Sequence, residues 1–374
     1  MYWINYMKWR FLLLFILLMS LSWAVHATER VQFKSNLLFR YDRQEFPRTP
    51  APRATVERYR IQWRPSLLFL LTPELELGIR AEANWIDESD EDVQPPRFPE
   101  FHTPLIDRDN FKRDTVVLSR AFVKYSLSPN LQILGGKFEN PFLVSELVWD
   151  NDLQPNGAAI SASFETAEGD FRFTARAADF YASHYLHDRT NVIGVQGVAQ
   201  ATAGPGRFTF SAAYYDHEVN DLAVQLLRTN TRAGSILPND YNLVDFIGRA
   251  RWNLIIPLTA QFNYVKNVAA DTFITSAPGN GDYAYMADVL VGQLQEPFGF
   301  RAGFAYHWVE SDAVLAAYNI DEWWFPTRGE GYRIHGGILP WKEFAFHVSY
   351  INQTLIDQTN EFERWLISAE INWP

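Results

Sequence analysis

Arginines recur in short segments where polar and apolar residues alternate, and they are the side chains of this sequence best suited to chemistry. Arg58, Arg60 and Arg64 share one parity in residues 55–64, and Arg80 lies in the next alternating segment. An arginine stays charged at neutral pH and donates forked hydrogen bonds to carboxylates and phosphates. Alternate residues of a β-strand share one face. The pattern therefore predicts a polar face that attracts anions.

A second group of candidate residues lies between Gly135 and Gly157, in the segment GGKFENPFLVSELVWDNDLQPNG. Its prolines cannot donate to a β-ladder, so it connects two strands. The segment is too apolar for bulk water, and we expect it to fold into something hollow. The residues expected at the resulting constriction are Glu139, Asn140, Pro141, Phe142, Glu146, Trp149, Asp150 and Asp152. Two interpretations of the Trp149-Asp150 pair stay open, a functional constriction element and an anchor that packs on the wall.

The elements that position these residues are predicted from a two-residue period that runs through the chain, which is typical of a half-buried sheet. Residues 74–85 are the clearest case, with Leu75, Leu77 and Ile79 opposite Glu76 and Arg80. The segments predicted as strands are 31–44, 55–71, 74–87, 114–127, 130–139, 158–166, 171–181, 190–202, 207–217, 242–256, 258–268, 283–293, 299–310, 329–339, 342–352 and 361–373. Seven tight turns alternate with eight long connections between these segments.

An even number of strands with alternating short and long connections indicates an up-and-down barrel. The polar faces carry too many charges to be buried dry, and segments of roughly 10–14 residues can cross a bilayer at a tilt. Aromatic residues lie near strand ends, as in membrane-interface girdles. The predicted fold class is all-β, a transmembrane antiparallel β-barrel of about 16 strands around an aqueous channel. We expect the third long loop to fold into this pore. A large soluble β-sandwich is the alternative.

The N-terminal segment and the composition indicate where the chain works. Residues 1–27 have the pattern of a cleaved signal peptide, with Lys8 and Arg10 before an apolar run. Translation from Met1 and translation from Met7 both fit this pattern. Residues 28–374 are then one barrel domain. The chain has no cysteine, so it has no disulfide framework, and its net charge of −11 argues against a nucleic-acid partner.

Catalytic motifs are absent from the sequence. There is no Gly-x-Ser-x-Gly, no His-Glu-x-x-His and no glycine-rich phosphate loop. We therefore expect no enzymatic activity, no cofactor and no metal site.

One block of sequence carries a family resemblance. It reads RAFVKY at 120–125, GKF at 136–138, NPF at 140–142, LVWD at 147–150, DL at 152–153 and PNG at 155–157. This block resembles the putative porins of Gram-negative outer membranes and is more distantly similar to the phosphate-selective porins O and P. The resemblance implies a trimeric or monomeric outer-membrane pore narrowed by its third long loop, here residues 140–157. One departure is the end Trp373-Pro374, since such barrels usually end on an aromatic residue.

The functional prediction is an outer-membrane porin for passive diffusion of small hydrophilic solutes or ions, with a preference for anions. The basic residues expected to line the pore are Arg58, Arg60, Arg64, Arg80, Arg120, Lys124, Lys137, Arg172, Arg176, Arg249, Arg251, Arg301 and Arg333. The alternative is that they pair with Glu57, Glu76, Glu82 and the acidic loop, which leaves little selectivity; Lys137 would then pair with a loop aspartate.

The alternative to a channel is a closed barrel with a binding, adhesion or structural role. The expected partners are outer-membrane lipid, small hydrophilic solutes or anions, and further copies in a homotrimer.

Overall fold

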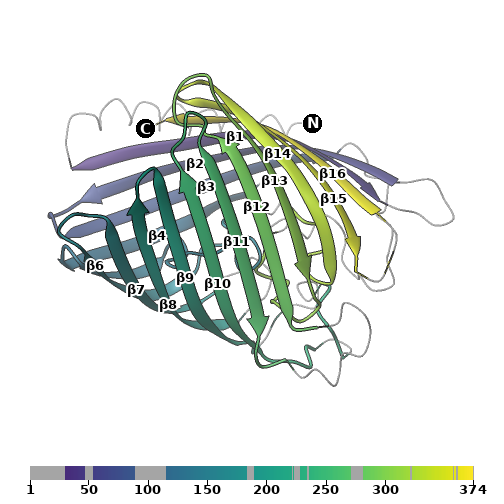
Figure 1. The fold of residues 1–374 in the computed structure, drawn as a ribbon, viewed down its shortest axis with the longest axis horizontal. Coiled ribbons are helices and arrows are strands. Elements are labelled where there is room, and N and C mark those ends of the chain that lie inside the picture. Colours follow the sequence, from purple (N-terminus) through teal and green to yellow (C-terminus); the bar gives the residue numbers. More distant parts are fainter. Residues whose placement is uncertain are drawn as a thin grey trace, which may run out of the picture.

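In the part of the chain that the structure describes, sixteen antiparallel strands form one closed barrel, in which sequence neighbours pair and β1 also pairs with β16 (Figure 1). The computed structural model describes residues 30–46, 54–88, 115–182, 189–220, 222, 228–233, 236–270, 281–320, 322–356, 358 and 361–373. The predicted signal peptide, residues 1–27, lies outside these ranges. The predicted fold class is confirmed.

The strand bounds follow the alternating pattern closely. They are β1 (Val31–Phe46), β2 (Ala54–Leu70), β3 (Leu75–Glu88), β4 (Thr115–Ser128), β5 (Leu131–Lys137), β6 (Asn156–Glu165), β7 (Phe171–Tyr181), β8 (Asn191–Ala203), β9 (Gly206–Glu218), β10 (Tyr241–Trp252), β11 (Leu258–Asn267), β12 (Tyr283–Gly292), β13 (Gly299–Val309), β14 (Gly329–Trp341), β15 (Phe344–Leu355) and β16 (Glu361–Trp373).

Two predicted strands end earlier than expected. The segment 242–256 stops at Trp252, and Leu254–Ile256 form the turn to β11. The segment 130–139 shortens to the seven residues of β5. Gly136 has a φ of 110°, and a Cβ there would lie 2.4 Å from the carbonyl oxygen of Ala121. This positive φ, which L side chains rarely adopt, lies within the last ladder pairs of β5, just before the third loop begins.

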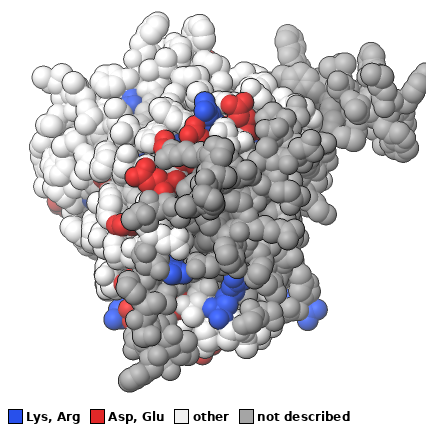
Figure 2. Space-filling model, turned by 90° about the vertical axis from the view of Figure 1, so that its right-hand side faces the viewer, with Lys and Arg blue, Asp and Glu red and all other residues white. Residues whose placement is uncertain are grey.

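The two faces of the barrel wall differ as the alternation predicts. Large apolar side chains such as Phe39, Val195, Phe210 and Phe304 are exposed on the outer face. Their sequence neighbours point inward and include most of the arginines and glutamines. Figure 2 shows a broad, mostly uncharged wall to the upper left, with acidic side chains gathered near the centre of the view. An apolar outer wall with a polar interior suits a barrel in a membrane.

Closure of the sheet satisfies the backbone of every edge. The register between β1 and β16 runs from Ser35↔Trp373 to Glu45↔Glu363. A bilayer offers no water to an unpaired strand edge, so only a closed sheet can cross it. No helix among the described residues is long and apolar enough to cross a membrane.

Candidate functional site: the lumen and its constriction

The third long connection, between β5 and β6, lies against side chains of the inner wall. A backbone hydrogen bond from Phe138 N–H to Pro155 O, at 3.0 Å, closes its neck. Leu143 exchanges two hydrogen bonds with the side chain of Gln196 on β8, at 2.8 and 2.7 Å. The Ser145 hydroxyl hydrogen-bonds to the Asn263 side chain on β11. These contacts fix the connection, residues 138–155, across the interior. We call it the constriction loop.

The apolar residues of the constriction loop form a core with the wall. Phe142 packs edge-on against Tyr215 at 5.2 Å between ring centroids, and Trp149 packs edge-on against Phe180 at 5.6 Å. Gly194 makes room for this packing, since a Cβ there would lie 2.7 Å from the ring of Phe142. Burial of the loop's apolar side chains therefore keeps it inside the barrel.

The Trp149-Asp150 pair has the contacts of an anchor. Trp149 is 3% exposed and donates its indole N–H to Leu153 O at 3.1 Å. Asp150 accepts the Asp152 N–H at 2.8 Å through Oδ1. Nearby, Asn140 accepts the Phe142 N–H at 3.0 Å. These local bonds satisfy backbone groups that a loop would otherwise leave unpaired.

A second connection, residues 310–328 between β13 and β14, also folds against the inner wall. Tyr318, Trp323 and Phe325 are 0%, 2% and 1% exposed. Asp312 accepts hydrogen bonds from the Tyr241 hydroxyl at 2.9 Å and from the Asn239 side-chain amide at 3.0 Å. The pattern of strands and turns predicted a long connection here but not that it folds inward. The aromatic run Trp323-Trp324-Phe325, unusual in a solvated loop, was the available signal. We call residues 310–328 the second inward loop.

The two inward loops bind each other. Trp149 stacks on Tyr318 with centroids 5.5 Å apart, and the Asp150 N–H donates to Tyr318 O at 2.6 Å. The Ile320 N–H donates to Glu146 O at 3.1 Å. At the entry of the second inward loop, burial raises the pKa of the Glu310 carboxyl above its usual value. The two inward loops thus form one packed unit inside the barrel.

Most basic residues around this unit are ion-paired. Arg58 and Arg364 both contact Asp42 at 2.7 Å. The other pairs are Arg64 with Asp152 and Glu82, Arg80 with Glu82, Arg120 with Glu139, Lys124 with Glu76, and Arg333 with Glu146 and Glu322. On β2, β3, β4, β14 and β16 the alternative of paired charges therefore describes the geometry.

The arginines on β7 and β10 are held differently. Arg176 donates to Gln196 at 2.9 Å, Arg249 to Gln261 at 2.8 Å and Arg251 to Gln293 at 2.5 Å. Within the described ranges, no carboxylate forms an ion pair with these arginines. A neutral amide orients a guanidinium without cancelling its charge, and it leaves other N–H donors of the group for a solute.

A lumenal cavity of about 570 Å³ is lined by both the constriction loop and the wall of β8 to β12. The loop contributes Val144, Ser145 and Glu146. The wall residues that carry the argument are Arg207, Arg249, Arg251, Gln261 and Asp288. Arg207 is directly opposite Arg251 in the register of β9 and β10. Sequence reasoning omitted Arg207, although its parity with Thr209 and Ser211 placed it on the polar face.

The remaining predicted residues are spread along the wall. Arg60 is buried on β2, Arg172 is exposed on β7, and the Nε of Arg301 on β13 is buried without a hydrogen-bond partner in the described structure. Lys137 lies near the charges of Glu82 and Arg80. No ion pair joins Lys137 to Asp150 or Asp152 in the described structure. The pore-lining role of the whole set stays a prediction.

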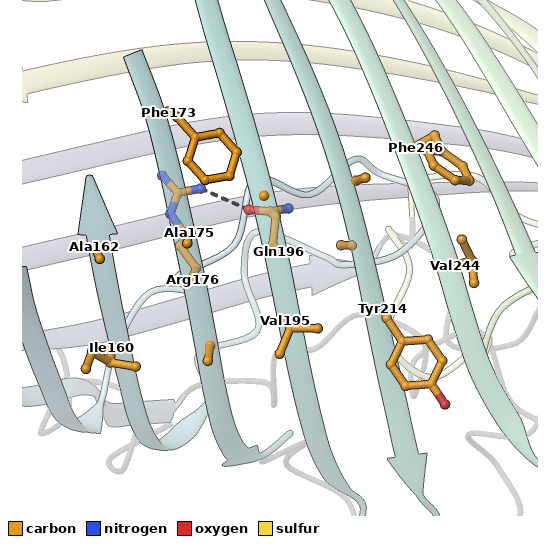
Figure 3. Close-up of a pocket in the computed structure, with 14 residues that line it drawn as sticks. Ile160, Ala162, Phe173, Ala175, Arg176, Val195, Gln196, Tyr214, Val244 and Phe246 are labelled. Atoms are coloured by element: carbon orange, nitrogen blue, oxygen red, sulfur yellow. Dashed lines mark hydrogen bonds between the residues drawn. The ribbon is translucent and has the colours of Figure 1, made fainter. Parts of the chain in front are cut away.

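A hollow of about 630 Å³ on the outer face is no candidate for a polar solute. Figure 3 shows Ile160, Phe173, Val195 and Phe246 around it, on β6 to β10. Its lining is mostly apolar, although Arg176 and Gln196 also contribute, and it lies on the face that carries the exposed hydrophobic residues. The described residues also contain no group of three or more histidine, aspartate or glutamate side chains placed to hold a metal ion.

Comparison with known proteins agrees with this geometry. The family described as putative porin matches residues 104–220, a range that contains the constriction loop. The resemblance to putative porins is confirmed. No curated protein matches this chain. It is similar in fold to OprB of Pseudomonas putida, with a TM-score of 0.61, 8% identity, and coverage of 92% of this chain and 94% of that one.

A second similar fold is OmpF of Salmonella typhi, solved in complex with daunomycin. Its TM-score is 0.50 at 11% identity, with coverage of 92% of this chain and 97% of OmpF. Sequence identities this low support the similarity of fold but give no information about the solute. The family match and the closed barrel agree with the predicted location in the outer membrane.

Proposed function

We propose that this porin lets small hydrophilic solutes and ions diffuse passively across the outer membrane, with a preference for anions. The path runs through the cavity between the constriction loop and the wall of β8 to β12. The observation that carries the proposal is the set Arg207, Arg249 and Arg251, which lines this cavity without carboxylate partners among the described residues.

The sign of the preference follows from how charge is divided around the lumen. The ion pairs around the two inward loops cancel most of the charge there, so that side contributes a weak field. The unpaired arginines stay positive at every pH at which the barrel works. A wall of arginines in a narrow aqueous passage raises the local concentration of anions. The net negative charge of the whole chain does not oppose this, because exposed charges more than a Debye length away are screened.

Single-channel recording tests the proposal. The refolded barrel is inserted into a planar bilayer, and a salt gradient gives the reversal potential. We expect discrete conductance steps and a reversal potential displaced toward that of the anion. Steps without anion preference would keep the channel and remove the selectivity.

The two inward loops favour one competing function, a closed barrel with a binding or structural role. Both loops are packed against the inner wall and against each other. Protein that is shown to be folded and inserted but gives no conductance steps would support that alternative.

We also propose a homotrimer as the assembled state. The mass of the assembly in native detergent micelles tests this proposal.

A further inference from the structure

Arg333 on β14 is the basic residue through which the two inward loops meet. Its side chain is 6% exposed. Nη2 lies 2.9 Å from Glu146 Oε1 of the constriction loop, and Nη1 lies 3.5 Å from Glu322 Oε2 of the second inward loop. The guanidinium also lies over the ring of Trp323, 5.6 Å from its centroid. One cation thus faces two carboxylates and an aromatic face.

The two carboxylates differ in what else holds them. Glu322 also contacts Arg40 Nη1 at 3.3 Å. In the described structure, Arg333 is the only charged group that contacts the Glu146 carboxylate. The other polar contact of this carboxylate is with a neutral donor, the Trp323 indole N–H, at 3.4 Å. Loss of the charge at position 333 would therefore leave Glu322 paired and Glu146 unpaired.

Glu146 also belongs to the lining of the lumenal cavity, and its side chain is 23% exposed. The other carboxylate of that lining, Asp288, lies 3.3 Å from the Nε2 of His335. An unpaired Glu146 would face Arg249 and Arg251 across the cavity. It would attract cations into the space where those arginines attract anions.

We propose that Arg333 is a specificity-determining residue that acts through Glu146. By pairing with Glu146 it removes a negative charge from the lining of the cavity, so that the unpaired arginines set the selectivity. This inference rests on the proposed function, since it requires ions to pass through the cavity. It assigns to Arg333 the task of neutralising the constriction loop, whereas the sequence suggested that it lines the pore.

Three variants test the inference by reversal potential in planar bilayers. Arg333→Gln should lower the anion-to-cation permeability ratio about fivefold at 0.1 M salt, the effect of one unpaired charge near a passing ion after screening by the salt. Glu146→Gln should raise the ratio by a similar factor. The double variant should return close to the wild-type ratio, because neither charge remains.

The double variant separates the possible roles of Arg333. A pore-lining Arg333 that is independent of Glu146 predicts that the double variant stays as low as Arg333→Gln, and this result would overturn the inference. A merely structural role predicts altered conductance and added noise that Glu146→Gln does not repair. Arg333→Lys, which keeps the charge but not the forked contacts, should keep the ratio within about twofold of wild type.

Recordings of the wild-type barrel show whether a negative result contradicts the proposed function or only the role of Arg333. A wild-type barrel without steps contradicts the proposed function. A conducting wild type whose ratio does not change in Arg333→Gln contradicts this inference alone. If Arg333→Gln does not fold, Glu146→Gln still decides, because an unchanged ratio in that variant shows that its carboxylate is not sensed by passing ions.

Discussion

Neutralising the unpaired arginines of the cavity should lower anion preference in steps. Arg207→Gln, Arg249→Gln and Arg251→Gln each remove one positive charge while keeping hydrogen-bonding capacity. A sphere with the 570 Å³ volume of the cavity has a radius of about 5 Å, so an ion at its centre lies roughly 5 Å from each guanidinium. At this distance one charge contributes about 0.8 kcal/mol in water, attractive for an anion and repulsive for a cation.

The anion-to-cation permeability ratio changes through both the attraction of the anion and the repulsion of the cation. Screening at 0.1 M salt reduces the sum to about 1 kcal/mol, or about fivefold for each arginine. Independent contributions multiply, so the triple variant should lose about a hundredfold. In 1 M salt, where the Debye length falls to about 3 Å, the loss should nearly disappear.

Reversal potentials in matched salt gradients measure this ratio for each variant. Arg58→Gln is the matched control, because Arg58 is ion-paired with Asp42, which Arg364 also holds. We expect the control to stay within about twofold of wild type. The reasoning would be refuted by a triple variant with an unchanged ratio, or by a control that shifts as much as the single variants.

Three further predictions concern the inward loops. The sequence has no cysteine. The double variant Ser145→Cys, Asn263→Cys should therefore form a single disulfide on oxidation and leave the conductance unchanged. Failure to cross-link would mean that the constriction loop is not docked on β11. Gly194→Ala should lower the free energy of unfolding by about 1–3 kcal/mol through overpacking, measured by urea titration in detergent micelles. Gly135→Ala, whose added Cβ would meet nothing within 4 Å, is its control, and equal losses would contradict the packing argument. Asp312→Asn should cost about 2 kcal/mol by weakening charge-assisted hydrogen bonds, and a midpoint equal to that of wild type would show that the second inward loop is not held there.

The barrel was predictable from the sequence because its determinants are local. A strand in a two-faced wall must alternate, so the period of residues 74–85 and its counterparts marked nearly every strand within a few residues. The turns were marked by proline and glycine. What failed locally was the end of two strands, at Trp252 and at Lys137, which the alternating pattern placed four and two residues later.

The candidate site was predictable only in part, because its geometry depends on contacts between distant segments. Alternation placed the arginines on the inner face but could not tell which of them meet a carboxylate. Arg58 and Arg249 have the same local pattern, yet one pairs with Asp42 and the other with Gln261. The second inward loop was missed for the same reason, since its position depends on partners on other strands, such as Tyr241.

The pairing of β1 with β16 has a consequence for how the chain folds. It joins Asn36 to Glu370, residues 334 positions apart in sequence. Contacts between such distant residues form slowly, because a long stretch of chain must be ordered before they are gained. Until β16 arrives, β1 keeps an open edge that can pair with other chains. The barrel therefore has its greatest tendency to aggregate just before the last strand closes, and helpers that shield a strand edge would act at that step.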